Sequence, residues 1–183
     1  MSLNNCAVNI CDDSELGTYE VSECGALIPG GSNAIILLTC GSLLTDASNG
    51  TQIQAEITAG RAYAFPGISA TLDAASAVVI TSKLGCTPDS VSTYNRVGTL
   101  YNPNVTLQNI NIFRTILSGG LWGGLLIKEC AANRVTWIDA AISFQGNRIL
   151  PQTENEEQRI DATFNWKDLY DPRVFAMPTG DFW

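Results

Sequence analysis

The chain has 183 residues, of which 45% are hydrophobic and 15% are charged, and its formal net charge at pH 7 is −8. A chain of this length fits one domain whose core is large enough to fold without disulfides or a metal. The excess of acid argues against tight nucleic-acid binding, because affinity for phosphate depends on lysine and arginine that displace counterions.

Residues 1–24 form the first segment, and we expect them to be an extended N-terminal arm or edge strands. Residues 1–60 contain no Lys or Arg, and most of their acids lie in this arm: Asp12, Asp13, Glu15, Glu20 and Glu23. One interpretation is an acidic, solvated face that aids solubility. The other is an acidic surface that must lie near nucleic acid without binding it.

A domain is expected from residue 25 to residue 172, and it begins with strand and helix patterns. The apolar run 33–39 (NAIILLT) predicts a strand covered on two sides. Residues 46–60 (DASNGTQIQAEITAG) predict one short helix, with Thr51 as its cap, Ile53 and Ile57 on its buried face, and Gly60 at its end. Residues 61–66 (RAYAFP) resume a strand.

The middle of the chain combines one ambiguous pattern with a polar stretch. Residues 71–82 fit helix or strand by period, although Val78, Val79 and Ile80 favour a strand at the end. Residues 85–104 are rich in Gly, Pro, Asp, Asn, Ser and Thr, and we expect a long loop with a short strand at 97–101. Long loops in compact domains are usually functional.

Residues 105–166 show the strongest alternation of apolar and polar side chains. The runs 105–117 (VTLQNINIFRTIL), 135–144 (VTWIDAAISF) and 159–166 (RIDATFNW) each predict a half-buried strand, and 125–130 predicts a buried one. Turns are expected at Gly119–Gly124 and Asn133-Arg134, and 150–158 is an exposed acidic connection. This pattern predicts a mainly β fold, an antiparallel β-sandwich or barrel with one flanking helix and extended terminal arms.

Residues 173–183 (RVFAMPTGDFW) form an aromatic C-terminal arm after a turn at 168–172. The arm contains Phe175, Met177, Phe182 and Trp183, whose exposure to water would be costly. Two interpretations remain: the arm folds back onto its own domain, or it docks on a neighbouring subunit, where aromatic anchors dominate the binding energy.

The six cysteines lack the spacing of a zinc site and the start of the chain lacks the pattern of a signal peptide. We interpret most of them as reduced, buried apolar residues. Zinc bound by Cys6, Cys11, Cys24 and Cys40 is the alternative, but these residues contain no C-x-x-C pair. No apolar run reaches the ~18 residues of a membrane helix, so we expect no membrane span.

No catalytic, cofactor-binding or metal-binding motif is found, and we expect no enzyme and no cofactor. Histidine is absent, which removes the commonest general base and metal ligand. The glycine clusters at 30–31 and 119–124 match neither nucleotide-binding motif and are interpreted as turns. Asp168 with Asp171, or Asp12 with Asp13, are the available carboxylate pairs, which turn chemistry and helix capping explain equally well.

Two segments carry a resemblance to a known family: residues 44–65 (LTDASNGTQIQAEITAGRAYAF) and 159–172 (RIDATFNWKDLYDP). Their order of elements resembles that of structural proteins of tailed-bacteriophage virions, in particular tail-tube proteins. The resemblance implies a sandwich or barrel that assembles into hexameric rings, whose sheets join into an inner barrel around the DNA channel. It further implies a virion protein assembled in the host cytoplasm, in contact with copies of itself and with other virion proteins.

Within that resemblance, ring stacking maps onto the 85–104 loop and the two arms. The expected subunit contacts are therefore Tyr94, Tyr101, Phe175, Met177, Phe182 and Trp183. The acidic residues of the N-terminal arm would face the lumen, so that DNA passes without specific binding. The six cysteines and the long aromatic arm depart from the commonest tube proteins.

Three further hypotheses compete with a tail-tube subunit. Within the structural class, the chain would be a capsid decoration or head-to-tail connector subunit. A monomeric β-sandwich binding module, an adhesin or carbohydrate-binding domain, would use Trp122, Trp137, Tyr94 and Tyr101 as its platform. An enzyme that works through carboxylates would show a partly buried acid pair with raised proton affinity in a cleft.

Overall fold

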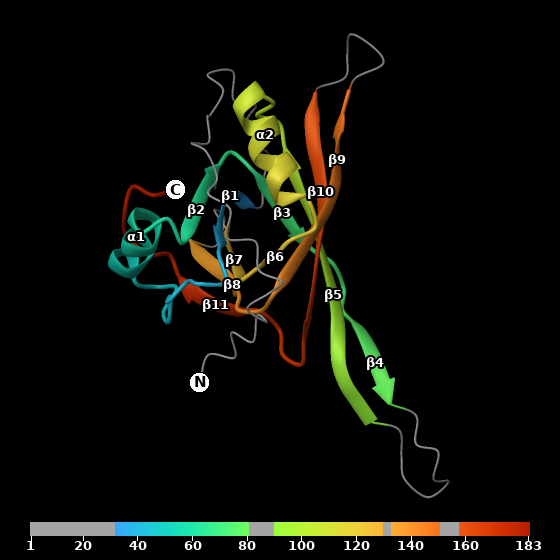
Figure 1. Ribbon diagram of the computed structural model, residues 1–183. Helices are drawn as coiled ribbons and strands as arrows, with labels where there is room; N and C mark the ends of the chain where they lie inside the picture. Colours follow the sequence, from blue (N-terminus) through green and yellow to red (C-terminus); the bar gives the residue numbers. More distant parts are fainter. Residues whose placement is uncertain (1–31, 81–89, 130–132, 151–157) are drawn as a thin grey trace, which may run out of the picture.

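The fold consists of two antiparallel sheets and two helices, as a computed structural model of residues 32–80, 90–129, 133–150 and 158–183 shows (Figure 1). The five-stranded sheet has the order β11-β8-β7-β1-β2. Its strands are β1 (Ser32–Leu38), β2 (Ala62–Pro66), β7 (Gly124–Glu129), β8 (Arg134–Ile138) and β11 (Arg173–Ala176). The prediction of a mainly β, sandwich-like fold with a short helix is confirmed.

The six-stranded sheet has the order β3-β5-β10-β9-β6, and its sixth strand, β4, pairs with β5. Its strands are β3 (Ser69–Leu72), β4 (Ser76–Ile80), β5 (Ser90–Asn102), β6 (Leu121–Trp122), β9 (Ile142–Ile149) and β10 (Arg159–Asp168). The β10 strand is central: it pairs with β5 on one side and with β9 on the other. The alternation predicted for this strand is confirmed, because every second residue of it is buried: Ile160, Ala162, Phe164 and Trp166.

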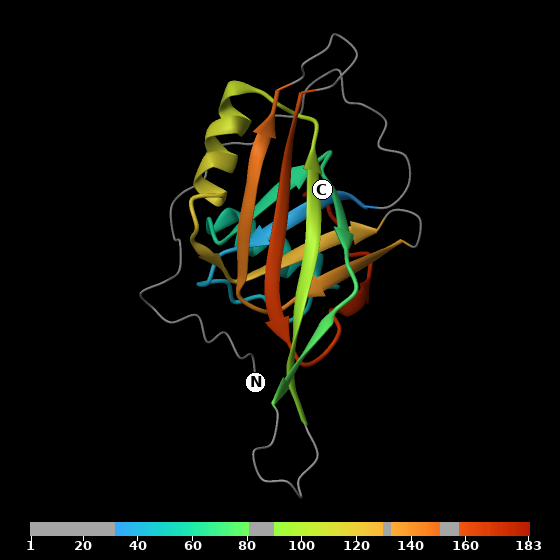
Figure 2. The same cartoon turned by 90° about the vertical axis from the view of Figure 1, so that its right-hand side faces the viewer.

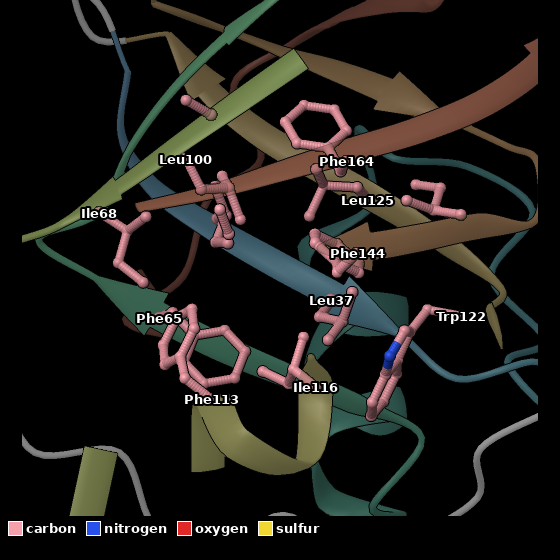
Figure 3. Close-up of a cluster of buried hydrophobic side chains, with 14 of the residues drawn as sticks. Leu37, Phe65, Ile68, Leu100, Phe113, Ile116, Trp122, Leu125, Phe144 and Phe164 are labelled. Atoms are coloured by element: carbon pink, nitrogen blue, oxygen red, sulfur yellow. The ribbon is translucent and has the colours of Figure 1, made fainter. Parts of the chain in front are cut away.

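The main core lies between the two sheets (Figure 3). Large side chains from both sheets meet there, among them Leu37, Phe65, Leu125, Phe144 and Phe164. Burial of each such side chain contributes about 1.5–3 kcal/mol to folding. The Ser32 hydroxyl group links the sheets at one edge of the core, since it donates to the carbonyl of Ala70 at 2.9 Å.

A second apolar cluster covers the opposite face of the five-stranded sheet. Helix α1 (Gly50–Thr58) contributes Ile53, and the C-terminal residues contribute Phe182, to a cluster with Ile36, Leu126 and Trp137. The five-stranded sheet is therefore covered on both faces, which explains why β1 is apolar on both sides. No described helix covers the outer face of the six-stranded sheet (Figure 2).

Helix α1 confirms the helix expected at 46–60, but its cap differs from the prediction. The N-cap is Asn49, whose side chain accepts a hydrogen bond from the backbone N–H of Gln52. Thr51 lies in the first turn and is exposed, so its assignment as the cap was wrong. Gly60 follows the helix with a φ of +70°, the left-handed conformation that glycine adopts without strain.

Residues 105–117 were predicted to be a strand, and this prediction was wrong. They form helix α2 (Leu107–Ile116), capped by Thr106, whose side chain accepts from the N–H of Asn109. The buried residues Asn109, Ile112, Phe113 and Ile116 have the spacing of one helix face. The described part of the chain therefore has two helices, and α2 packs against the main core through Phe113, whose ring centre is 5.9 Å from that of Phe65.

Three other boundaries also differ from the expectation. Residues 90–102 form the long strand β5, which contains the short strand expected at 97–101, so the predicted loop was wrong over 90–96 and at residue 102. Residues 135–144 are two strands in different sheets, β8 and β9, joined by residues 139–141. Gly123, expected in a turn, lies instead against the end of β1. Its N–H donates to the Leu38 carbonyl oxygen at 2.8 Å, and a Cβ at this position would lie 2.3 Å from the Thr39 carbonyl oxygen.

The C-terminal residues 173–183 pack on their own domain. Residues 173–176 pair with β8 as an edge strand, from Arg173 opposite Trp137 to Ala176 opposite Arg134. Phe182 is only 7% exposed. Of the two interpretations of this segment, the fold-back arrangement is the one that the structure has.

Several sequence predictions lie outside the described residues. These are the N-terminal arm 1–24, the glycine pair at 30–31 and most of the acidic connection at 150–158. Within the described ranges, no helix is long and apolar enough to cross a membrane.

Candidate assembly surfaces and the Asp139 pocket

A two-stranded ribbon, made of Ser76–Ile80 (β4) and residues 90–95 of β5, projects beyond the other strands at the end away from α2 (Figures 1 and 2). We call it the β4–β5 ribbon. Among the described strands, β4 pairs with β5 alone. A hairpin without a third strand or a packed face is marginally stable in water.

The β4–β5 ribbon is uncharged and partly apolar. Its described residues include no Asp, Glu, Lys or Arg. Val79 and Val91 are opposite each other in the register, and 51% and 43% of their surfaces are exposed. Natural edge strands are usually protected from pairing by charges or proline, and the ribbon has neither in its described part.

Tyr94 and Tyr101, the two tyrosines expected in a contact loop, lie instead on β5. Tyr94 is at the base of the ribbon, where the Arg96 guanidinium is 5.5 Å from its ring centre. Tyr101 lies at the other end of β5, with Arg159 5.8 Å from its ring centre. Both are half-buried, so each retains only part of its surface for a partner.

Two edges of the six-stranded sheet are unpaired in the described part of the chain. The β6 strand pairs only with Ile142 and Ser143, so no described strand covers β9 from Phe144 to Ile149 on that side. On the other side, β3 and β4 pair with β5 through one edge each. Among the described strands, the sheet therefore has one unpaired edge on each side.

The outer face of this sheet is polar and nearly free of acid. Thr71, Thr99, Thr163 and Gln145 form one row across four neighbouring strands. The hydroxyl oxygens of Thr71 and Thr99 are 2.6 Å apart, which is a hydrogen bond. On β10 the same face carries the cations Arg159 and Lys167 and the acid Asp161, and Arg159 is paired with Asp161 at 2.9 Å.

The predicted aromatic contacts of the C-terminal segment are mostly internal. Phe175 lies 5.8 Å from Trp137, and Phe182 lies 5.5 Å from Trp183, in both cases between ring centres. Met177 packs against the same cluster, and Trp183 has the Lys128 ammonium 5.5 Å from its ring centre. The acids expected to face a lumen, Asp12, Asp13, Glu15, Glu20 and Glu23, lie outside the described residues.

Three carboxylates line a pocket of about 490 Å³ between the 139–141 link and the 169–172 connection. We call it the Asp139 pocket. Asp168 and Asp171, a pair considered from the sequence, both line it, together with Asp139, which the sequence did not point to. Asp139 accepts from Arg173 at 2.7 Å, and these residues are 34 positions apart, so no local pattern predicts their contact.

Burial raises the pKa of the Asp139 carboxyl above its usual value, and the nearby Asp168 acts in the same direction, whereas Arg173 opposes the rise. Arg173 is also 5.0 Å from the ring centre of Trp137. Asp171 instead accepts from Arg96 at 2.7 Å. The pocket thus holds one partly buried carboxyl with a raised pKa, whereas the hypothesis of a carboxylate enzyme expected a pair of such acids.

Cys40 is disulfide-bonded, and it is the one cysteine within the described ranges. The prediction of a reduced thiol is wrong for this residue. A sulfur in a disulfide is not a thiolate, so Cys40 cannot be the zinc ligand considered above. Among the described residues, no group of three or more Cys, Asp or Glu is arranged to hold a metal ion.

No protein-family model, no curated protein and no solved structure matches this chain.

Proposed function

We propose that the chain is a non-enzymatic structural subunit of a virion that self-assembles into rings or a tube, in particular the tail tube of a tailed bacteriophage. The observation that carries the proposal is the uncharged, projecting β4–β5 ribbon. Its exposed Val79 and Val91 remain in water unless a neighbour covers them. The resemblance of residues 44–65 and 159–172 to tail-tube proteins points the same way.

The negative net charge of the chain favours the uncharged ribbon as the contact between copies. With a net charge of −8, two copies repel each other over most orientations. The ribbon is a surface where copies meet without bringing carboxylates together. Burial of its apolar side chains would then add to association at about 25 cal/mol per Å².

The open edges supply a second contact. A sheet with one free edge on each side can pair head-to-tail with copies of itself, and such a heterologous contact generates rings where the rotation closes. The edges without a partner among the described strands are β9 from Phe144 to Ile149 on one copy, and β3 or β4 on the next. Main-chain hydrogen bonds supply the affinity in this mode.

A channel lined by the polar outer face of the six-stranded sheet would let DNA pass without specific binding. The face carries the threonine row described above and, on β10, the two cations Arg159 and Lys167, of which Arg159 is paired with Asp161. The acids of residues 1–24 would supply the repulsion of phosphate. Further partners would be other virion proteins, with assembly in the host cytoplasm. A disulfide at Cys40 is compatible with a particle that persists outside the cell.

A capsid decoration or head-to-tail connector subunit is the alternative within the structural class, since it would use the same ribbon. The binding-module hypothesis loses its proposed platform, because Trp122 and Trp137 are 0% and 3% exposed. A stacking platform needs an exposed ring face.

The test replaces the apolar pair of the ribbon by an opposite-charge pair, Val79→Glu with Val91→Lys. The two positions are cross-strand partners, so opposite charges preserve the hairpin while they remove its apolar surface. Light scattering should show oligomers for the wild-type chain and monomers for the double variant, with unchanged circular dichroism. Leu107→Glu is the control, because Leu107 is 77% exposed on α2, away from the ribbon. Oligomers of wild-type size from the double variant would refute the ribbon as the contact.

A further inference from the structure

The Asp139 pocket has a use beyond self-assembly. Its volume of about 490 Å³ lies in the range of small-molecule sites, roughly 300–1,000 Å³. It is bordered by the two connections that pass between the sheets, residues 139–141 and 169–172. Both connections are short, so the side chains that they carry are held by the strands at each end.

The polar groups of the pocket are held in place by one another. Arg173 is fixed by Asp139 at 2.7 Å and by the ring of Trp137. One oxygen of Asp168 accepts from the backbone N–H of Tyr170 at 3.1 Å, which holds the backbone of the turn at that residue. A carboxylate has about four acceptor positions, so Asp139 and Asp168 keep capacity for a ligand. Preorganisation of this kind lowers the cost of binding.

The charges of the pocket balance. Asp139, Asp168 and Asp171 are offset by Lys167 and Arg173, which line the pocket, and by Arg96, which pairs with Asp171. A site with equal numbers of positive and negative groups does not favour an ion of either sign. It fits a neutral ligand that both donates and accepts hydrogen bonds.

The pocket also has an aromatic surface open to solvent. Tyr170 lines it and is 73% exposed, the largest exposure among the tyrosines and tryptophans of the described chain. An exposed ring next to carboxylates and cations matches the two faces of a sugar, whose C–H groups stack on aromatic rings and whose hydroxyls hydrogen-bond.

We propose that the Asp139 pocket binds a neutral, hydroxyl-rich ligand of the carbohydrate class, stacked on Tyr170 and hydrogen-bonded to Asp168, Asp139 and Arg173. Burial raises the pKa of Asp139, so the charged carboxylate is less stable here than in water. Carboxyl groups with such a shift are found preferentially at binding and catalytic sites, which agrees with the proposed role. The proposal is independent of self-assembly, since no residue of the ribbon takes part.

The test is calorimetric titration of the full-length chain with three probes: cellobiose, lactose and N,N′-diacetylchitobiose. We expect at least one to bind, and Tyr170→Ala to weaken that binding about three- to tenfold, the factor expected for loss of one stacking contact. Leu169→Ala is the matched control: Leu169 is the preceding residue, 47% exposed, and does not line the pocket.

The proposal is overturned if none of the three probes binds, or if Tyr170→Ala binds the probe as tightly as the wild-type chain. A Leu169→Ala variant as weak as Tyr170→Ala would also overturn it, because the loss would then reflect the connection and not the ring. The Val79→Glu, Val91→Lys variant should bind the sugar as the wild type does, so the failure of the assembly proposal is distinguishable from the failure of this one.

Discussion

Truncation of Phe182 to alanine measures how firmly the C-terminal segment is held by its own domain. Phe182 is 7% exposed and belongs to the second cluster, with Ile53 of α1 and Leu126 of β7. Replacement of a core phenylalanine by alanine costs about 3–5 kcal/mol through lost transfer energy and the cavity left behind. Because terminal residues open locally at low cost, we expect the lower end of this range, about 3 kcal/mol.

The assay is urea unfolding followed by tryptophan fluorescence, at a protein concentration low enough that association does not contribute to stability. The control is Val174→Ala on β11, whose side chain is 53% exposed and should contribute within about 0.5 kcal/mol. A loss below about 1 kcal/mol for Phe182→Ala, together with a loss of assembly, would refute this reasoning. It would show that the aromatic side chain acts between subunits.

Three more predictions concern the frame of the domain. Arg61 lowers the pKa of Glu56, so the stability that this ion pair supplies is present above the ordinary pKa of 4.5 and is lost as the pH falls below it. In thermal melts recorded against pH, Glu56→Gln should therefore reduce the loss of stability on the acid side. Gly123→Ala should destabilise the fold by about 1–3 kcal/mol in urea unfolding, because the new methyl group would meet the Thr39 carbonyl oxygen at 2.3 Å. In the unfolded, unreduced chain, Cys40 should resist alkylation, and after reduction it should be labelled, as peptide mass spectrometry would report.

Each of these has a contrary result. If Glu56→Gln loses as much stability at low pH as the wild-type chain, that loss is caused by other carboxyl groups. Gly41→Ala is the control for Gly123→Ala, since the nearest atom to its Cβ is the Thr39 hydroxyl oxygen at 3.8 Å; equal losses for both variants would reject the close-approach argument. Alkylation of Cys40 without reductant would show that it is a free thiol.

Strand positions were predictable where alternation coincided with one buried face. In β10, every second residue from Ile160 to Trp166 is buried, as period two requires. In 105–117 the same criterion failed, because Ile110 and Ile112 mimic alternation while Asn109, Ile112, Phe113 and Ile116 carry the helical period. Thr106 as an N-cap was the local signal for the helix.

The candidate sites depended on contacts between residues far apart in the chain. Asp139 and Arg173 meet only because β8 pairs with β11. Likewise, the composition of 90–102 is typical of a loop, and pairing with β10 and β4 makes it a strand. Aromatic content marked 173–183 as significant, although it could not distinguish packing on the same domain from docking on a neighbour.

Negative-stain electron microscopy of the purified full-length chain tests self-assembly most directly. The account predicts rings or short tubes of uniform diameter, which disappear in the Val79→Glu, Val91→Lys variant. Isolated particles of monomer size at every concentration, for a chain that is folded by circular dichroism, would contradict it.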